Sequence, residues 1–383
     1  MHANKTILLA GVTTSNNALY HRFPILLPDI AAFIGLSGGD SVAFVRDIEM
    51  ARAEKSGLAG RICSASEYPP EGGLDGDRDT AMAQAVAEFL RRETDGTIHT
   101  DRTLPFIFAH HIREAGLELC YDPELGVLNR RTKSEREFEA LRHAQTVTQQ
   151  AMIMACETIG RATSDAEGIL HHDGEVLTSE RVRRMITRFL IDEGFSNPND
   201  SIVVTLPHVV DCHHFGTGPL KTGLPVIVDI FPRDDTSRYC GDCTRTVVHG
   251  EPSDELVAMH KAVVAAKQAG VDALKPGETG HAVHQHVLDV IKNHGYAYRP
   301  GSCDLEDPAP AMRHGTGHGI GLDVHEPILL SEGGGEILLH EVFTVEPGLY
   351  SSRYGGVRVE DMVIVIEDGG EVIAGFHEGL EWG

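Results

Sequence analysis

The sequence predicts an α+β protein with two domains, and three observations lead to this fold class. The chain has 383 residues, 41% of them hydrophobic, which is enough for two separate cores. From about residue 132 onward, helical and strand patterns are interspersed without the regular βα alternation of a doubly wound sheet. The same part contains two similar stretches that indicate an internal repeat. We expect one domain over residues 1–131 and a second over residues 132–383.

The first domain is predicted to be a smaller α/β unit. Residues 6–11 and 41–47 have the apolar, β-branched composition of strands. Residues 80–92 have the apolar spacing of an amphipathic helix. We find no group of His, Asp, Glu or Cys with the spacing of metal ligands here, so we expect a supporting or substrate-gating domain.

The second domain is predicted to begin with a long helix. Ser134 and Glu137 form the S-x-x-E pattern of a capping box, and apolar residues then recur on one helical face. Further helices are expected at 179–193, 253–274 and 279–293. Strands are expected at 202–206, 224–231, 245–250, 341–347 and 357–367.

Composition excludes several classes of partner. The chain has 33 basic and 57 acidic residues, a formal net charge of -24, which argues against nucleic acid and anionic membranes as partners. No uninterrupted apolar stretch approaches the ~20 residues of a membrane helix, and the apolar run near the N-terminus is too short for a signal peptide. The seven cysteines are an odd number with scattered spacing, which predicts no disulfide framework. We expect a cytoplasmic protein.

The internal repeat carries four acidic residues. The stretches LKTGLPVIVD and ILLHEVFTVE are apolar strands that end in Asp229 and Glu346. The stretches DCTRTVVHG and EDMVIVIEDG begin with Asp242 and Glu360 and run into glycine. A single acid of this kind is often a structural salt bridge, because an isolated buried carboxylate costs several kcal/mol. Four acids in related positions predict a shared metal site on a pseudo-twofold axis.

The stretch HGTGHGIGLDVH, residues 314–325, supplies imidazoles to the same site. It has glycine at four alternate positions, which allows its backbone to approach another group closely. Four carboxylates with one imidazole suit Mn²⁺, Co²⁺, Fe²⁺ or Zn²⁺. They are too many ligands for one tetrahedral ion and fit two ions about 3.5–4 Å apart.

The order Asp229, Asp242, His318, Glu346, Glu360 resembles the metal-ligand set of the pita-bread (M24-type) metallopeptidases. This family includes methionine aminopeptidase, aminopeptidase P and prolidase. The matching stretches are VDIFPRDDTSRYCGDCTRT, HGTGHGIGLDVHEP, FTVEPGLY and GGVRVEDM, which lie between residues 132 and 367. The first domain resembles the creatinase-type domain that precedes the catalytic domain in aminopeptidase P and prolidase.

The resemblance implies a role for each ligand. Asp229 is the bidentate ligand of one ion, and Asp242 and Glu360 bridge both ions. His318 and Glu346 complete the shell of the second ion. The resemblance also implies two divalent ions per chain, with Mn²⁺ as our first choice and Co²⁺, Zn²⁺ or Fe²⁺ as alternatives.

The resemblance implies further catalytic residues. Glu346 is the proton shuttle, and His325 contacts the substrate or the tetrahedral intermediate. An upstream histidine is expected before Asp229; we favour His213, with His214 left open. Arg358 resembles an arginine that orients the ligand carboxylates.

The implied activity is hydrolysis of Xaa-Pro bonds at the N-terminus of short peptides, by an aminopeptidase or dipeptidase that forms a homodimer. Ile328 and Leu329 follow the HEP motif where some prolidases carry an arginine for the substrate carboxylate, which argues against a strict dipeptidase. Three alternatives stay open: a hydrolase or lyase of the same fold acting on a small non-peptide, a metal-free creatinase-like enzyme, and a non-enzymatic pita-bread binding module.

Overall fold

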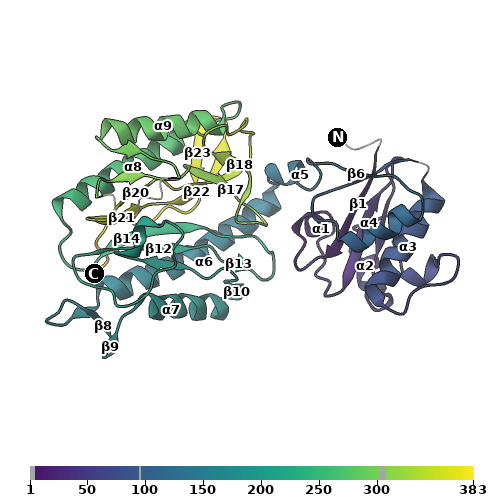
Figure 1. Cartoon of the computed structure of the whole chain (residues 1–383), viewed down its shortest axis with the longest axis horizontal. Coiled ribbons are helices and arrows are strands. Elements are labelled where there is room, and N and C mark those ends of the chain that lie inside the picture. Colours follow the sequence, from purple (N-terminus) through teal and green to yellow (C-terminus); the bar gives the residue numbers. More distant parts are fainter. Residues whose placement is uncertain (1–4, 95, 302–307) are drawn as a thin grey trace. The chain divides into compact units, whose positions relative to one another are not determined.

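The computed structural model describes residues 5–94, 96–301 and 308–383 (Figure 1). The chain divides into two compact units, residues 1–130 and 131–383, one residue away from the expected domain boundary. The short helix α5 (Leu128–Arg131) lies at this division. The six cysteines among the described residues are free thiols, and Cys303 lies outside the described residues.

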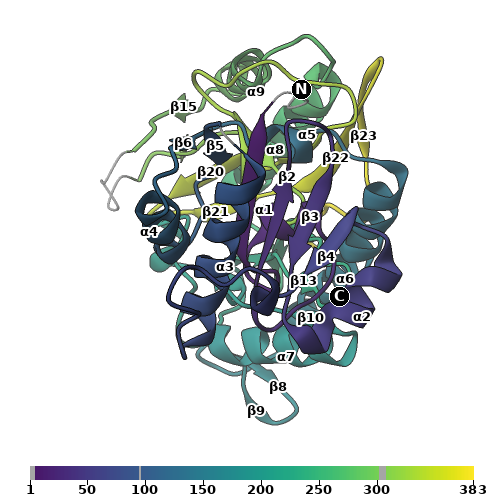
Figure 2. The ribbon, with the colours of Figure 1, turned by 90° about the vertical axis from the view of Figure 1, so that its right-hand side faces the viewer.

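Unit 1 is a six-stranded mixed sheet with helices on both faces (Figure 2). The strands are β1 (Thr6–Val12), β2 (Ile30–Gly35), β3 (Ser41–Phe44), β4 (Arg61–Cys63), β5 (Ile98–Thr100) and β6 (Leu119–Tyr121), in the order β4-β3-β2-β1-β5-β6. The helices are α1 (Asn17–Arg22), α2 (Met50–Ser56), α3 (Arg78–Glu93) and α4 (Phe106–Glu114). Leu8 and Ala10 pack towards α3 and α4, and Ile7 and Leu9 pack towards α1 and α2. Alternate residues of β1 therefore serve two cores.

The helices of unit 2 begin and end close to their predicted positions. They are α6 (Glu135–Gly160), α7 (Ser179–Asp192), α8 (Asp254–Ala273) and α9 (Gly280–Asn293). The predicted capping box of Ser134 and Glu137 is present at the start of α6. Thr178, Ser253 and Thr279 cap the other three helices through side chains that accept backbone N–H bonds. None of the helices in the described part of the chain is long and apolar enough to cross a membrane.

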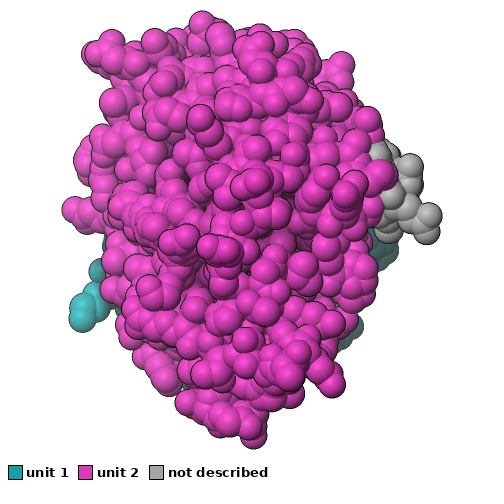
Figure 3. Space-filling view, turned by 90° about the vertical axis from the view of Figure 1, so that its left-hand side faces the viewer, with its two compact units in different colours: residues 1–130 teal, residues 131–383 magenta. Residues whose placement is uncertain are grey.

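The strands of unit 2 form several small sheets. Figure 3 shows the surface of this unit in magenta. One sheet contains β11 (Ile202–Val204), β12 (Pro225–Ile230) and β14 (Cys243–Val248). A second contains β17 (Gly317–Gly319), β18 (Glu326–Leu330), β19 (Val342–Val345), β22 (Asp361–Ile366) and β23 (Gly369–Val372). A third contains β15 (Ala297–Tyr298), β16 (Ala311–Met312), β20 (Gly348–Ser351) and β21 (Gly355–Arg358). Shorter pairings join β7 (Thr163–Ser164), β8 (Leu170–His172) and β9 (Glu175–Val176), and β10 (Phe195–Ser196) with β13 (Arg233–Asp234).

The strand predicted over residues 357–367 is wrong as a single element. The structure has two strands there, β21 and β22, which belong to different sheets and are separated at Val359 and Glu360. The backbone N–H of Glu360 donates instead to the carbonyl of Thr244 on β14, over 3.1 Å. This bridge connects the two halves of the repeat.

The two halves of unit 2 have the same construction. In the first half β12 pairs antiparallel with β14, and Val226, Val228 and Ile230 pack against α6 and α7. In the second half β19 pairs antiparallel with β22, and Phe343 and Val345 pack against α8 and α9. Because side chains alternate along a strand, the face away from the helices carries the residues between these. That face carries the four repeat acids.

Candidate metal centre

Every residue that the sequence analysis assigned to the site lines one cavity of about 510 Å³ in unit 2. The set comprises Asp229, Asp242, His318, Glu346, Glu360, His213, His325 and Arg358. These residues are separated by up to 147 positions in the sequence (360 minus 213). The fold therefore brings all of the predicted residues together.

The acids reach this cavity from four strand ends, but the repeat is imperfect. Val345 pairs with Asp361, so the next residues, Glu346 and Glu360, are neighbours across the β19–β22 pair. Ile230 stands opposite Cys243, so the partner position of Asp242 is occupied by Phe231. Asp229 lies two residues earlier, on the same face of the strand. Phe231, at the position that corresponds to Glu346 in the second half, lines the cavity with an apolar side chain.

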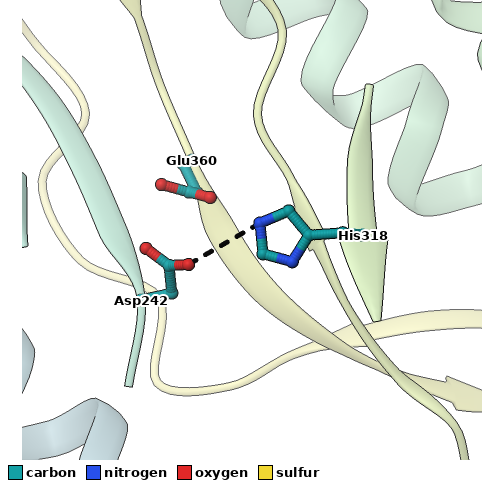
Figure 4. A group of neighbouring side chains, drawn as sticks. All are labelled: Asp242, His318 and Glu360. Atoms are coloured by element: carbon teal, nitrogen blue, oxygen red, sulfur yellow. Dashed lines mark ion pairs between the residues drawn. The ribbon is translucent and has the colours of Figure 1, made fainter. Parts of the chain in front are cut away.

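Asp242, His318 and Glu360 form a compact group in the cavity. Each offers one ligand atom, and these atoms all lie within 4.8 Å of one another. His318 Nε2 is 3.8 Å from Asp242 Oδ2 and 3.6 Å from Glu346 Oε1. Figure 4 shows the three side chains pointing towards a common position from three different strand segments. A carboxylate–imidazole set of this kind suits a divalent first-row metal.

The Asp229 carboxylate is held in place by a hydrogen bond from Arg358. Arg358 Nη2 donates to Asp229 Oδ2 over 2.7 Å, and its Nη1 donates to the hydroxyl of Tyr350 over 2.8 Å. Asp229 Oδ1 is buried and has no hydrogen-bond partner among the described residues. A buried carboxylate oxygen without a partner is costly and indicates that a further group belongs beside it.

Burial and the negative charges of neighbouring carboxylates disfavour the charged forms of Asp242, Glu346 and Glu360. Burial, followed by the negative charges of Glu360, Asp229 and Glu346, raises the pKa of Asp242 well above its usual value. Burial, followed by Glu346 and Asp229, likewise raises the pKa of Glu360. Burial and Asp229 raise the pKa of Glu346 to about 8, although its side chain stays 21% exposed towards the cavity. A divalent cation would reverse this preference and hold the carboxylates in their charged form.

The imidazole of His318 is neutral at physiological pH. Burial, followed by the nearby His325, lowers the pKa of His318 to about 4. The rings of His318 and His325 lie 4.3 Å apart between centroids. A neutral imidazole keeps the lone pair that a metal requires.

The structure distinguishes the two upstream histidines. His213 lines the cavity. His214 accepts a hydrogen bond from the backbone N–H of Gly216 through its Nδ1, and its ring stacks on His208 at 4.3 Å. Of the two, His213 is the one that lines the cavity, and its catalytic role stays a prediction.

Two glycines allow the histidine segment to pass close to its neighbours. A Cβ at Gly317 would lie 1.9 Å from the carbonyl oxygen of Thr344 on β19. A Cβ at Gly321 would lie 2.7 Å from the carboxylate of Glu326. The first glycine sets the close pairing that carries His318, and the second permits the turn before His325.

The model of metallopeptidase family M24 matches residues 139–367 of this sequence. That range contains all of the cavity residues assigned above and more than half of the chain.

The chain belongs to metallopeptidase family M24.

Comparison with individual proteins agrees with M24 membership. The chain is 31% identical over 242 residues to the probable dipeptidase PepE of Mycobacterium bovis, which is 63% of this chain and 57% of that protein. The chain thus matches little more than half the length of this curated relative. Among solved structures, the Xaa-Pro dipeptidase of Bacillus anthracis has a TM-score of 0.78 at 24% identity, covering 98% of this chain and 94% of that one. The X-Pro aminopeptidase of Thermotoga maritima has a TM-score of 0.78 at 20% identity, covering 98% and 96%. This M24 chain therefore has the pita-bread fold.

Three supporting residues of this M24 centre were missed by the sequence analysis. Gln145 on α6 donates to the carbonyl of Asp242 and accepts from its N–H, both over 2.9 Å. Thr244 donates to Glu360 Oε2 over 2.6 Å. Tyr350 links Arg358 to His314 Nε2, which lies 2.7 Å from its hydroxyl. The available signal was Gln145 itself, a polar residue that lies next to Ala144 on the buried side of α6.

Proposed function

We propose that this chain is a dinuclear metal-dependent peptidase that hydrolyses Xaa-Pro bonds at the N-terminus of short peptides, as an aminopeptidase or dipeptidase. The observation that carries the proposal is the set of four carboxylates and one neutral imidazole on one cavity wall. Carboxylates with raised pKa values, together with the unpartnered Asp229 Oδ1, fit a site built for divalent cations.

The proposed ligands are Asp229, Asp242, His318, Glu346 and Glu360. When bound at these residues, two divalent ions would lower the pKa of a bound water towards neutrality and would polarise the scissile carbonyl. Mn²⁺ is our first choice, with Co²⁺, Zn²⁺ and Fe²⁺ as alternatives suited to the same oxygen and nitrogen ligands.

The protein's own residues move protons and stabilise charge. Glu346 is partly exposed to the cavity, where its carboxylate accepts a proton from water and passes it to the leaving nitrogen. His325 and His213 also line the cavity and stabilise the developing oxyanion or the proline nitrogen. Arg358 keeps Asp229 in a fixed orientation through its 2.7 Å hydrogen bond.

The cavity and the relatives both support a proline-containing substrate. Ile202, Phe231, Val324 and Leu329 give the cavity an apolar wall beside the acids, which suits a pyrrolidine ring. Relatives and structural neighbours are named as dipeptidase, Xaa-Pro dipeptidase and X-Pro aminopeptidase. Leu329 contributes an uncharged side chain to the cavity, and this favours an aminopeptidase over a strict dipeptidase within the proposal.

A peptide panel tests the proposal. Protein loaded with Mn²⁺, Co²⁺ or Zn²⁺ is incubated with Xaa-Pro dipeptides, Xaa-Pro tripeptides and peptides without proline, beside Asp242→Ala and Glu346→Ala. We expect release of the first residue from Xaa-Pro peptides by the loaded protein and loss of that activity in both variants. Metal uptake without cleavage of any peptide would contradict the peptidase proposal and favour a small non-peptide substrate. Uptake of less than one ion per chain would favour a metal-free or non-enzymatic role.

We also propose that the protein is a cytoplasmic homodimer. Size measurement in solution tests the dimer, and fractionation of the source cells tests the location. A monomeric elution volume would contradict the first, and recovery outside the cytoplasmic fraction would contradict the second.

A further inference from the structure

Arg245 lies on β14, on the opposite face of the strand from Asp242. Its side chain is completely buried, and it is among the largest fully buried side chains of the described residues. Cys243 and Val247 share its face of β14 and pack against α6 and α7. Arg245 therefore lies behind the wall that carries the proposed metal ligands, not in the cavity.

Arg245 holds the junction between the two halves of the repeat. Its Nη1 donates to the carbonyl of Glu360 over 2.6 Å and to the carbonyl of Thr244 over 2.9 Å. The same two residues are joined by the Glu360 N–H to Thr244 carbonyl bond of 3.1 Å and the Thr244 hydroxyl to Glu360 carboxylate bond of 2.6 Å. One guanidinium nitrogen thus fixes the backbone at the point where β14 meets the break before β22.

The rest of the guanidinium is anchored in a buried network of opposite charges. Its Nη2 donates to Asp361 Oδ1 over 2.7 Å, and Lys267 on α8 pairs with the other Asp361 oxygen and with Glu378. Its Nε donates to the carbonyl of His377 over 2.8 Å. The guanidinium carbon lies 4.0 Å from the centroid of the Phe376 ring, which covers its flat side.

These contacts give Arg245 little freedom. Its charge has a carboxylate partner, and its nitrogens donate to acceptors on β14, β22 and residues 376–378. An arginine with a planar set of donors can satisfy several acceptors at once, whereas lysine presents a single ammonium group. The backbone position of Glu360 therefore depends on a side chain that never reaches the cavity.

We propose that Arg245 is a positioning residue of the metal centre, which sets the place of the Glu360 carboxylate relative to Asp242 by clamping the Thr244–Glu360 junction. This inference rests on the proposed function, because it requires Glu360 to be a metal ligand. A ligand displaced by a fraction of an ångström binds metal less well, and groups that support ligands change metal affinity by about 10–100-fold when removed.

The test compares the full-length protein with Arg245→Met, Arg245→Lys and a matched control, Arg181→Met. Arg181 also clamps backbone carbonyls, donating to His172 over 2.7 Å and to Glu175 over 3.0 Å, but it lies on α7 and contacts none of the proposed ligands. Calorimetric titration with Mn²⁺ gives affinity and stoichiometry, and the visible absorption spectrum of the Co²⁺ form reports ligand geometry. Circular dichroism confirms folding of each variant.

We expect Arg245→Met to lose at least about tenfold in affinity for one or both ions and to show an altered Co²⁺ spectrum. Arg245→Lys should fall between it and the wild type, and Arg181→Met should bind metal as the wild type does. Wild-type affinity and spectrum in Arg245→Met, or an equal loss in Arg181→Met, would overturn the proposal. If Arg245→Met does not fold, wild-type affinity and spectrum in Arg245→Lys would overturn it.

The same titration separates this inference from the proposed function. A wild-type protein that binds two ions but cleaves no Xaa-Pro peptide contradicts the proposed function and leaves the Arg245 measurement valid. A wild-type protein that binds no metal overturns both.

Discussion

Arg358 donates to one oxygen of the Asp229 carboxylate over 2.7 Å and leaves the other oxygen, which is buried, without a hydrogen-bond partner among the described residues. The arginine is itself fixed by the hydroxyl of Tyr350 at 2.8 Å. This arrangement orients the Asp229 carboxylate and leaves one of its oxygens available to another group. In the proposed metal centre that group is a divalent ion.

Replacing Arg358 should weaken metal binding. Arg358→Met leaves Asp229 unsupported, so we expect a loss of about 10–100-fold in affinity for Mn²⁺ by calorimetry. Arg358→Lys keeps the positive charge, so its loss of affinity should be smaller. Some loss should remain, because lysine cannot contact Asp229 and Tyr350 with the same paired geometry. Unchanged affinity in both variants would show that Arg358 does not orient a ligand.

The metal-free protein should lose stability as the pH rises from 7 to just above 8, and the loss should level off beyond that pH. The pKa of Glu346 is raised from 4.5 to about 8 in the folded state. The contribution of Glu346 to stability is therefore complete below about pH 4.5, which is the pKa of this group in the unfolded chain. It decreases above that pH and is lost once the pH has risen through about 8. His318, with its pKa lowered to about 4, adds no slope in this range because it is neutral in both states. Thermal unfolding from pH 7 to 9 measures the effect.

Two comparisons check the origin of this slope. Glu346→Gln should flatten the fall in melting temperature, since it removes one titrating group. Metal binding at pH 7 should release protons, seen as a dependence of the calorimetric enthalpy on the buffer. A melting temperature that rises between pH 7 and 9 without metal would contradict the raised pKa values.

The two upstream histidines should differ in kinetics. His213→Ala should lower kcat/KM by about 10²-fold or more, because His213 lines the cavity and can stabilise the transition state. His214→Ala is the matched control, since His214 stacks on His208 and accepts from Gly216. We expect it to keep kcat/KM and to lose some stability. The reverse pattern would move the role to His214.

The buried pair of Lys133 and Glu326 should stabilise the turn that precedes His325. Lys133 Nζ donates to Glu326 Oε2 over 2.9 Å, and Glu326 Oε1 accepts from the N–H of Leu322 over 3.1 Å. Lys133→Met removes the ammonium partner of a buried carboxylate and should cost about 3–5 kcal/mol in the free energy of unfolding. Denaturant titration measures this cost, and Lys133→Met combined with Glu326→Gln should recover part of it. No recovery in the double variant would show that the charge of the Glu326 carboxylate is not the cause of the lost stability.

Much of the fold and the site could be predicted from residue types and their periodicity. Asp229 and Glu346 end apolar strands, and alternation along those strands decides that they face away from the helices. The capping box at Ser134 specifies where α6 begins because its hydrogen bonds are local. The assignment of metal-ligand roles to these residues remains a prediction.

Contacts between distant segments could not be predicted in this way. The break at Val359 and Glu360 exists because the Glu360 backbone pairs with Thr244 of the other half. The alternation of apolar residues along a strand does not identify such a partner. Gln145 and Tyr350 reach the site only through tertiary packing. The two-residue offset of Asp229 is likewise set by the pairing of Ile230 with Cys243.

The central claim is that this M24 chain cleaves Xaa-Pro bonds with bound metal, and one measurement tests it most directly. Metal-loaded protein is given Ala-Pro and Ala-Pro-Ala in parallel with Ala-Ala and Ala-Ala-Ala, and release of the first alanine is followed by mass spectrometry. We predict release from at least one proline peptide, at most trace release from its proline-free counterpart, and none with Asp242→Ala. Equal release from the proline and alanine peptides, or no release from any of the four, would contradict the claim.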